Sequence, residues 1–157
     1  MTKEKPNTAT ATYGDDSAWA DSKSPALGCL IGKAYQTMLS QLNSALKEAG
    51  LDITTSEYLA LRALYSSEGI QQCEIAQMVG KDKAAVCRCV AGLEKKGLVR
   101  TECVSHKCLR VFLTDKGREI EPKVMEVARI RHKALLDLTT PENLAIFTEI
   151  LKKVINQ

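Results

Sequence analysis

Thiol and imidazole side chains are the groups of this 157-residue chain that could ligate a metal or act as nucleophiles, and there are six cysteines and two histidines. Cys103, His106 and Cys108 fall close together, and with Cys87 as a fourth ligand they could recruit a metal ion. The segment lacks the paired C-x-x-C knuckles of structural zinc sites. We therefore predict no metal and no other cofactor, and expect most of these thiols to behave as small apolar side chains.

The same cysteines could form a redox site. If Ser105 and His106 make a two-residue turn, Cys103 faces Cys108 across a hairpin with Cα atoms about 4.5 Å apart, at the short edge of disulfide geometry. Nearby lysine and arginine would favour the reactive thiolate. Against this, Ser-His suits a tight turn poorly, and a longer loop would change the register. Cys103 and Cys108, followed by Cys87, are the predicted redox residues.

An enzyme is not favoured. A thiol catalyst needs a histidine and an orienting third group beside the cysteine. His106 and His132 lie in no recognisable catalytic pattern, and the Pro-Cys-His-Arg signature of DNA alkyl-transferases is absent. We expect no catalytic residues, and keep a thiol- or metal-based sensor or enzyme that uses Cys103, His106 and Cys108 as the alternative function.

Basic residues are concentrated in one segment. Residues 81–118 contain ten Lys and Arg against four acids, a net charge of +6, whereas the whole chain has a net charge of only +3. Such asymmetry is typical of a surface that neutralises nucleic-acid phosphates, although a well-solvated basic surface is the plain alternative.

The elements around this segment predict a winged helix-turn-helix. A helical apolar pattern over residues 71–79 stops at Gly80, and Asp82 can cap a second helix. This second helix ends at Lys95-Lys96-Gly97, and two runs rich in β-branched residues, 98–104 and 107–113, can pair as a hairpin. The apolar residues of the second helix, Val86, Val90 and Leu93, recur at i, i+4 and i+7.

Long apolar helices are predicted on both sides of this unit. The first spans about 25–50, and a capping box at Thr54-Thr55-Ser56-Glu57 begins the next. Thr114 and Asp115 cap a long helix with apolar positions as far as Leu138, and Thr140-Pro141 begins the last helix. The terminal helices carry broad apolar arcs, which indicates packing against a second copy of the chain.

The segment E-I-A-Q-M-V-G-K-D-K-A-A-V-C-R-C-V-A-G-L-E-K-K-G-L-V-R at 74–100, followed by L-T-D-K-G at 113–117, resembles the MarR family of bacterial winged-helix regulators. The resemblance extends over roughly residues 26–155. The chain departs from the family pattern in a wing about two residues shorter, a wing tip that reads Ser105-His106-Lys107, and Ala84, Ala85 and Cys87 where Ser and Thr are common.

The expected fold is thus mainly α, with a two-stranded β-wing and N- and C-terminal dimerisation helices. We expect a flexible tail over 1–24 and a single domain over 25–157. Within that domain, residues 51–118 would bind DNA, and residues 25–50 and 119–157 would form the dimer. The resemblance implies a homodimer that binds a palindromic operator in double-stranded DNA, usually as a repressor, with the two reading helices about 34 Å apart.

Arg88 is the best candidate for reading a base, because its planar fork can pair with both acceptors of guanine. The methyl groups of Ala84 and Ala85 could contact the methyl group of thymine. The lysines Lys81, Lys83 and Lys95 would contact phosphates. The amides that begin the third helix could hold a phosphate. We expect the wing to add affinity more than sequence readout. The predicted DNA contacts are Gln71, Gln72, Lys81, Lys83, Ala84, Ala85, Cys87, Arg88, Lys95, Arg100, His106, Lys107 and Arg110.

Members of the family often bind small aromatic acids or phenols, so the resemblance also implies an effector site between the dimerisation and DNA-binding regions. Tyr35, Met38, Tyr58, Arg62 and His132 could line it, although helical periodicity explains Tyr35, Met38 and Tyr58 equally well as core. An oxidant is the other candidate effector. No apolar run approaches the ~18 residues of a membrane span, so we expect a cytoplasmic bacterial protein without membrane partners, associated with the nucleoid through DNA.

Overall fold

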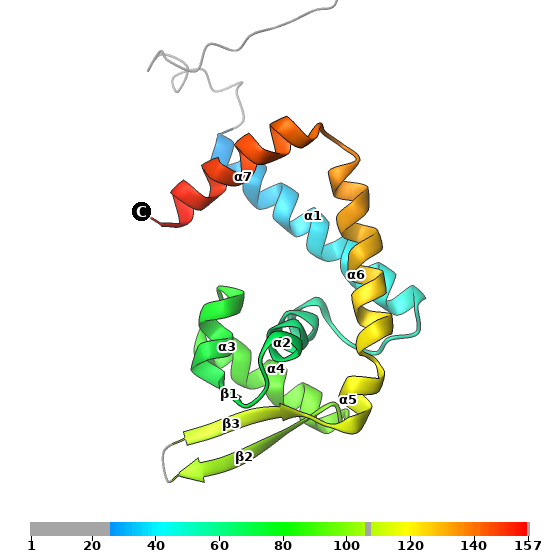
Figure 1. The fold of residues 1–157 in the computed structure, drawn as a ribbon, viewed down its shortest axis with the longest axis vertical. Helices are drawn as coiled ribbons and strands as arrows, with labels where there is room; N and C mark the ends of the chain where they lie inside the picture. Colours follow the sequence, from blue (N-terminus) through cyan, green and yellow to red (C-terminus); the bar gives the residue numbers. More distant parts are fainter. Residues whose placement is uncertain (1–25, 106–107, 157) are drawn as a thin grey trace, which may run out of the picture. The chain divides into compact units, whose positions relative to one another are not determined.

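Seven helices and three strands make up the part of the chain that the computed structural model describes, residues 26–105 and 108–156 (Figure 1). The chain divides into two units between Thr37 and Met38, inside the first helix, α1 (Leu27–Glu48). In the first unit the described residues are the N-terminal part of α1, whose side chains are exposed. All other elements belong to the second unit.

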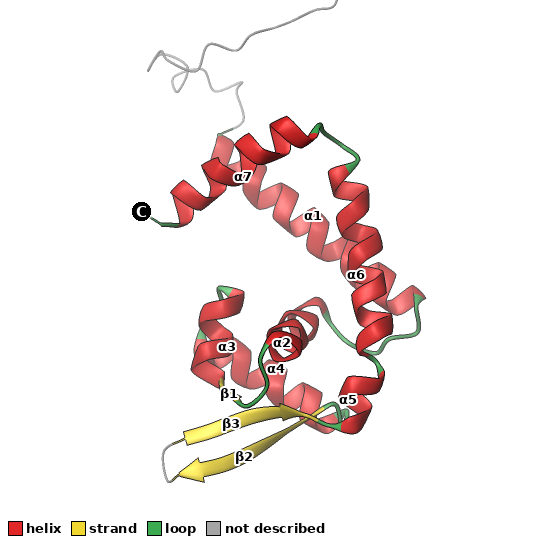
Figure 2. Ribbon diagram, viewed as in Figure 1, coloured by secondary structure: helices red, strands yellow, loops and turns green. Residues whose placement is uncertain are grey.

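A three-helix group forms the centre of the second unit. Helices α2 (Thr55–Ser66), α3 (Gln72–Val79) and α4 (Lys83–Lys95) contact one another pairwise (Figure 2). The capping box predicted for α2 is confirmed: Thr54 Oγ1 accepts from the Glu57 amide at 3.2 Å, and Glu57 Oε2 accepts from the Thr54 amide at 2.7 Å. Gly80 ends α3 with φ +63°, the left-handed conformation that glycine adopts without strain.

The wing has one strand more than expected. Strands β2 (Val99–Ser105) and β3 (Cys108–Leu113) form the predicted antiparallel hairpin. A two-residue strand, β1 (Ile70–Gln71), pairs with β3 on its other side, so the sheet order is β1-β3-β2. Strand β1 could not be predicted from the sequence, because two residues are too few to show an alternating pattern.

The C-terminal helices break once more than predicted. Thr114 caps a short helix, α5 (Asp115–Glu119), and α6 (Glu121–Leu136) begins immediately afterwards with Pro122 in its first turn. Proline cannot donate within a helix, and it fits the first turn, where no donor is needed. The single long helix expected to begin at Thr114 is therefore two helices, α5 and α6. Leu138, which was expected to be buried in that helix, lies beyond the end of α6 and is 80% exposed. The last helix, α7 (Pro141–Ile155), begins at Thr140 as predicted.

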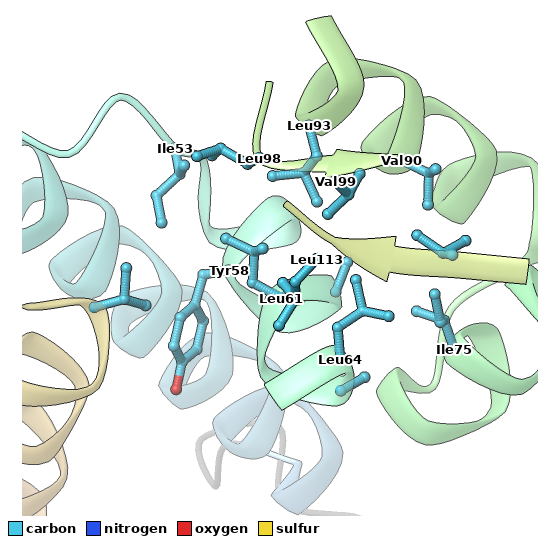
Figure 3. Close-up of a cluster of buried hydrophobic side chains, with 14 of the residues drawn as sticks. Ile53, Tyr58, Leu61, Leu64, Ile75, Val90, Leu93, Leu98, Val99 and Leu113 are labelled. Atoms are coloured by element: carbon cyan, nitrogen blue, oxygen red, sulfur yellow. The ribbon is translucent and has the colours of Figure 1, made fainter. Parts of the chain in front are cut away.

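The hydrophobic core joins the three-helix group to the wing. Figure 3 shows Leu61 and Leu64 of α2 in one cluster with Val90 and Leu93 of α4 and with Val99 and Leu113 of the strands, and Tyr58 of α2 at the edge of this cluster. Leu46 of α1 and Val124 of α6 are also fully buried. This core fixes the orientation of α4, the helix that carries the predicted DNA-reading residues. Among the described residues, no helix combines the length and apolar character needed to cross a membrane.

Candidate nucleic-acid interface

Helix α4 presents the outward arc that its periodicity predicted. Val86, Val90 and Leu93 are buried, with exposed fractions of 1% or less. On the opposite side of the helix, about half a turn away, lie the exposed residues Ala84, Arg88, Ala91 and Lys95. Burial of the three aliphatic side chains therefore sets which groups α4 can offer to a groove of DNA.

The first turn of α4 is held by its cap. Asp82 Oδ1 accepts from the Ala85 amide at 2.8 Å. This hydrogen bond, aided by the charge of Arg88, holds the pKa of the Asp82 carboxyl below its usual value. The carboxylate is therefore ionised near neutral pH, as a cap at the positive end of a helix dipole requires. Lys83 and Ala84 follow directly and are exposed.

The start of α3 is tied to α4 by a thiol. Cys87 Sγ donates to Gln72 Oε1 at 2.7 Å, which fixes the Gln72 amide group beside the reading helix. The Gln71 amide donates to Glu74 Oε2 at 2.6 Å, as part of a second capping box. A phosphate at the start of α3 would thus compete with the Glu74 carboxylate for the Gln71 amide, which sequence reasoning did not foresee.

A small hollow of about 120 Å³ lies beside these groups. Two of its lining residues, Cys73 and Leu109, were not expected at this surface. Leu109 is 51% exposed on β3, although it shares a face of the strand with the buried Val111. Strand alternation therefore predicts an inward position for Leu109 and could not have indicated its exposure. The hollow is lined by Gln71, Gln72, Cys73, Lys83 and Leu109.

Two arginines of the wing are engaged within the protein. Arg100 is paired with Glu102, and its guanidinium lies 4.9 Å from the centre of the Phe112 ring, directly across the hairpin. Arg110 donates to the carbonyl of Gly69. Both were predicted DNA contacts, and each would have to exchange or share these partners to bind a phosphate.

Other basic residues of segment 81–118 also have internal partners. Lys96 Nζ lies 2.8 Å from Glu57 Oε2, and Arg118 forms an ion pair with Glu68 at 2.8 Å. Lys116 Nζ donates to the carbonyl of Lys96 at 2.8 Å. Glu57 and Glu68 lie outside the segment, so counting charges along the sequence overstated the basic surface. The exposed cations left for DNA on α4 are Lys83, Arg88 and Lys95, with Lys81 half-buried before them.

The predicted contacts are not all in one place. Lys83, Ala84, Ala85, Cys87 and Arg88 share the first half of α4, next to Gln71 and Gln72. Lys95 lies twelve residues beyond Lys83, about 18 Å further along the helix axis. His106 and Lys107 lie outside the described residues.

The register of the hairpin differs from the one predicted for the two cysteines. Cys103 is opposite Leu109, and Ser105 is opposite Cys108, with an irregularity between Cys103 and Ser105. One extra residue on β2 produces this shift, as in a β-bulge. The expected two-residue turn, with Cys103 facing Cys108, is therefore wrong. Among the described residues no three His, Cys, Asp or Glu side chains are grouped as metal ligands, and His106 of the proposed cluster lies outside them.

The residues proposed for an effector cleft have different environments. Tyr58 is 4% exposed and belongs to the core, which was the alternative interpretation of this position. Arg62 and His132 are exposed. Tyr35 and Met38 are 46% and 43% exposed on α1 and belong to different units. Neither the hollow described above nor a larger one at the end of α4 is lined by any of the five.

A helix-turn-helix packed on a β-hairpin, with an exposed basic reading helix, defines the protein as a winged-helix protein. Comparison with known proteins supports this assignment. The model of the MarR family matches residues 51–107. The uncharacterised HTH-type transcriptional regulator YdgJ of Bacillus subtilis is 32% identical over 112 residues, which cover 69% of this chain and 68% of YdgJ.

Solved structures have the same fold. The oxidised form of MarR from E. coli is 27% identical and superimposes with a TM-score of 0.68, covering 85% of this chain and 96% of that one. The S. aureus MepR–DNA complex is 18% identical, with a TM-score of 0.77 over 85% of this chain and 98% of that one. The chain belongs to the MarR family of DNA-binding transcriptional regulators.

Proposed function

We propose that this protein acts in the bacterial cytoplasm as a homodimeric repressor on a palindromic operator, through residues 51–118. The observation that carries the proposal is the exposed arc on α4, where Arg88 stands between two alanines on a helix whose opposite face is fully buried. A rigid helix with one arginine and small neighbours can enter a major groove without steric conflict.

Most of the predicted contacts have a role in this proposal. Arg88 reads a guanine, and the methyl groups of Ala84 and Ala85 contact thymine. Lys81 and Lys83 contact phosphates, and Gln72, held by the Cys87 thiol, is positioned at the edge of the same surface. The wing adds backbone contacts from Arg100 and Arg110 once these residues exchange their internal partners.

The experiment that tests this function is operator selection with the full chain, followed by the Arg88→Ala variant. We expect Arg88→Ala to weaken operator binding by about 1–3 kcal/mol and to relax the base preference at one position of each half-site. The measurement is a titration of labelled operator and of random duplex at one fixed salt concentration, because phosphate contacts make affinity salt-dependent.

Arg129→Ala is the matched control for Arg88→Ala. Arg129 is an exposed arginine of α6, paired with Glu126, so its loss should leave operator binding intact. If Arg88→Ala lost affinity equally on operator and on random duplex, Arg88 would contact only the backbone.

The second part of the proposal, the homodimer, rests on exposed apolar side chains of the terminal helices. None of the residues of α7 is buried, and Ile146, Phe147, Ile150 and Val154 are between 49% and 60% exposed. These four recur at i, i+1, i+4 and i+8 and therefore share one face of the helix. On α1, Leu27, Leu30, Ile31 and Tyr35 are also exposed. We propose that residues 25–50 and 119–157 bury these faces against a second copy.

We expect Phe147→Asp to dissociate the dimer, because a carboxylate buried at an apolar interface without a partner costs about 2 kcal/mol or more. Analytical ultracentrifugation over a concentration series measures this shift. Lys152→Asp, an exposed position on the opposite side of the same helix, is the control, since it also introduces a carboxylate. A Phe147→Asp variant with the sedimentation and concentration dependence of the parent would contradict the assignment of α7 to the interface.

Control of DNA binding by a small ligand or by oxidation completes the proposal. Oxidation at Cys87 would remove the thiol donor that holds Gln72, and would thereby disturb the reading surface directly.

A further inference from the structure

A hollow lies at the C-terminal end of α4, next to Lys95 and Lys96. It has a volume of about 690 Å³, within the range of roughly 300–1,000 Å³ typical of small-molecule sites. All of its lining residues belong to the second unit, and none of them was singled out as an effector contact from the sequence. They come from the α1–α2 loop, the end of α4 and the region of α5: Gly50, Leu51, Asp52, Ile53, Lys95, Lys96, Leu98, Lys116 and Ile120.

The floor of this hollow is aliphatic. Leu51, Ile53 and Leu98 are core residues with exposed fractions of 6%, 5% and 4%, and Ile120 packs against the same core. Ile53 and Leu98 are neighbours at one edge of the core in Figure 3. The lining contains no aromatic ring, so the floor can bury an apolar body but cannot stack against a planar one.

The rim carries an excess of ammonium groups. Lys95, Lys96 and Lys116 line the hollow, with Asp52 as the acid among the lining residues. Glu57 lies beneath and neutralises Lys96, from which it is 2.8 Å away. With Asp52 and Glu57 set against the three lysines, the rim keeps one net positive charge. A site with this balance suits a single negative charge.

Donors for an anion remain on the rim. A lysine ammonium has three N–H groups, and Lys116 directs one of them to the carbonyl of Lys96 at 2.8 Å. This bond also satisfies a carbonyl at the end of α4 that would otherwise repel an anion. Lys95, adjacent in sequence, is exposed. Lys95 and Lys116 therefore both line the hollow whose floor is aliphatic.

We propose that this hollow binds a small amphipathic monocarboxylate. Its carboxylate lies between Lys95 and Lys116, and its alkyl body covers Leu51, Ile53 and Leu98. The aliphatic floor favours a flexible alkyl chain, and the single net charge favours one carboxylate over a phosphate or a dicarboxylate. Binding at this position does not depend on the proposed operator function, so the two can fail separately.

Isothermal titration of the full chain with decanoate, below its micellar concentration, tests the proposal. We expect saturable binding that weakens from decanoate to hexanoate by up to about fourfold for each methylene removed from the floor. Decanol and inorganic phosphate, which lack the charge and the apolar body respectively, should bind much more weakly. Equal binding of decanol and decanoate, or no effect of chain length, would overturn the proposal.

Variants of the rim locate the site. Lys116→Gln and Lys95→Gln should each weaken decanoate binding roughly tenfold, because each removes a charge-assisted hydrogen bond. Lys133→Gln, an exposed lysine of α6 outside the hollow, should bind decanoate like the parent.

Amide shifts in NMR spectra of the parent give a second readout that needs no substitution. Decanoate should move the resonances of Gly50 and Leu98 more than those of residues 71–79. Shifts confined to other regions, or equal affinities in Lys116→Gln and Lys133→Gln, would show that decanoate binds elsewhere.

Discussion

The Gly117→Ala variant should be less stable by about 2–4 kcal/mol, a lowering of Tm by roughly 5–15 °C for a chain of this size. A Cβ atom built on Gly117 would lie only 2.1 Å from the carbonyl oxygen of Leu98. That oxygen also accepts from the Thr114 amide at 3.1 Å, so the backbone cannot move aside without breaking this bond. Thermal unfolding followed by circular dichroism at one protein concentration measures the loss.

Two other glycines provide graded controls for this result. Gly32→Ala adds its methyl group to open space within α1, so it should be neutral or stabilising by up to about 1 kcal/mol. In Gly92→Ala the added Cβ atom would lie 2.6 Å from Glu57 Oε1. Because this oxygen belongs to a side chain that can move, the loss of stability should be intermediate. If Gly117→Ala were as stable as Gly32→Ala, the close packing of α5 on the Leu98 carbonyl would be refuted.

Lys96→Met should cost about 2–4 kcal/mol, because it leaves the Glu57 carboxylate buried without its cation. The Glu57 side chain is only 8% exposed and that of Lys96 26%, with their charged atoms 2.8 Å apart. Methionine has nearly the length and the apolar stem of lysine. The decrease in the free energy of unfolding therefore reflects the lost charge more than lost packing. Denaturant titration at neutral pH, with the protein concentration held constant, gives the free energy of unfolding.

A double-mutant cycle with Glu57→Gln separates the pair from the burial of each member. The Lys96→Met/Glu57→Gln variant should be more stable than Lys96→Met alone, since no buried carboxylate remains. A double variant whose cost equals the sum of both single costs would show that the two groups do not interact.

The pH dependence of stability follows from the same pair. Burial alone would raise the pKa of Glu57, but the hydrogen bonds from Lys96 and Thr54, with the charge of Lys96, bring the pKa below the ordinary value of 4.5. A carboxyl with a lowered folded-state pKa stabilises the fold above 4.5, and this contribution is lost as the pH falls from there through the folded-state pKa. Glu57→Gln should therefore lose less stability than the parent on acidification below pH 4.5.

Local patterns predicted the DNA-binding unit because its folding rules are local. Helix ends depend on neighbouring residues, so the caps at Thr54, Asp82, Thr114 and Thr140 could be recognised by residue type and are present. The buried face of α4 followed from a spacing of 3.6 residues per turn, which also determined that Arg88 points outward. These features hold in any fold that buries the apolar face.

Such local patterns could not predict side-chain partners that are distant in the sequence. In the sequence, Arg110 and Arg118 count as cations available to DNA. In the structure, Arg110 donates to the carbonyl of Gly69, and Arg118 forms an ion pair with Glu68. The hairpin register depends on one extra residue of β2, and an alternating pattern cannot show a bulge. The predicted register, with Cys103 opposite Cys108, was wrong for this reason.

By itself, the sequence determined the order of helices and wing, the face of α4 that meets solvent, and the family. Only the tertiary structure decided which cations remain for DNA, why Gly92 and Gly117 have no side chain, and where a hollow forms between the α1–α2 loop and α5. The physical reason is separation along the chain. Caps and periodicity act within a few residues, whereas Glu57 and Lys96, or Leu98 and Gly117, meet only after the core has brought distant segments into contact.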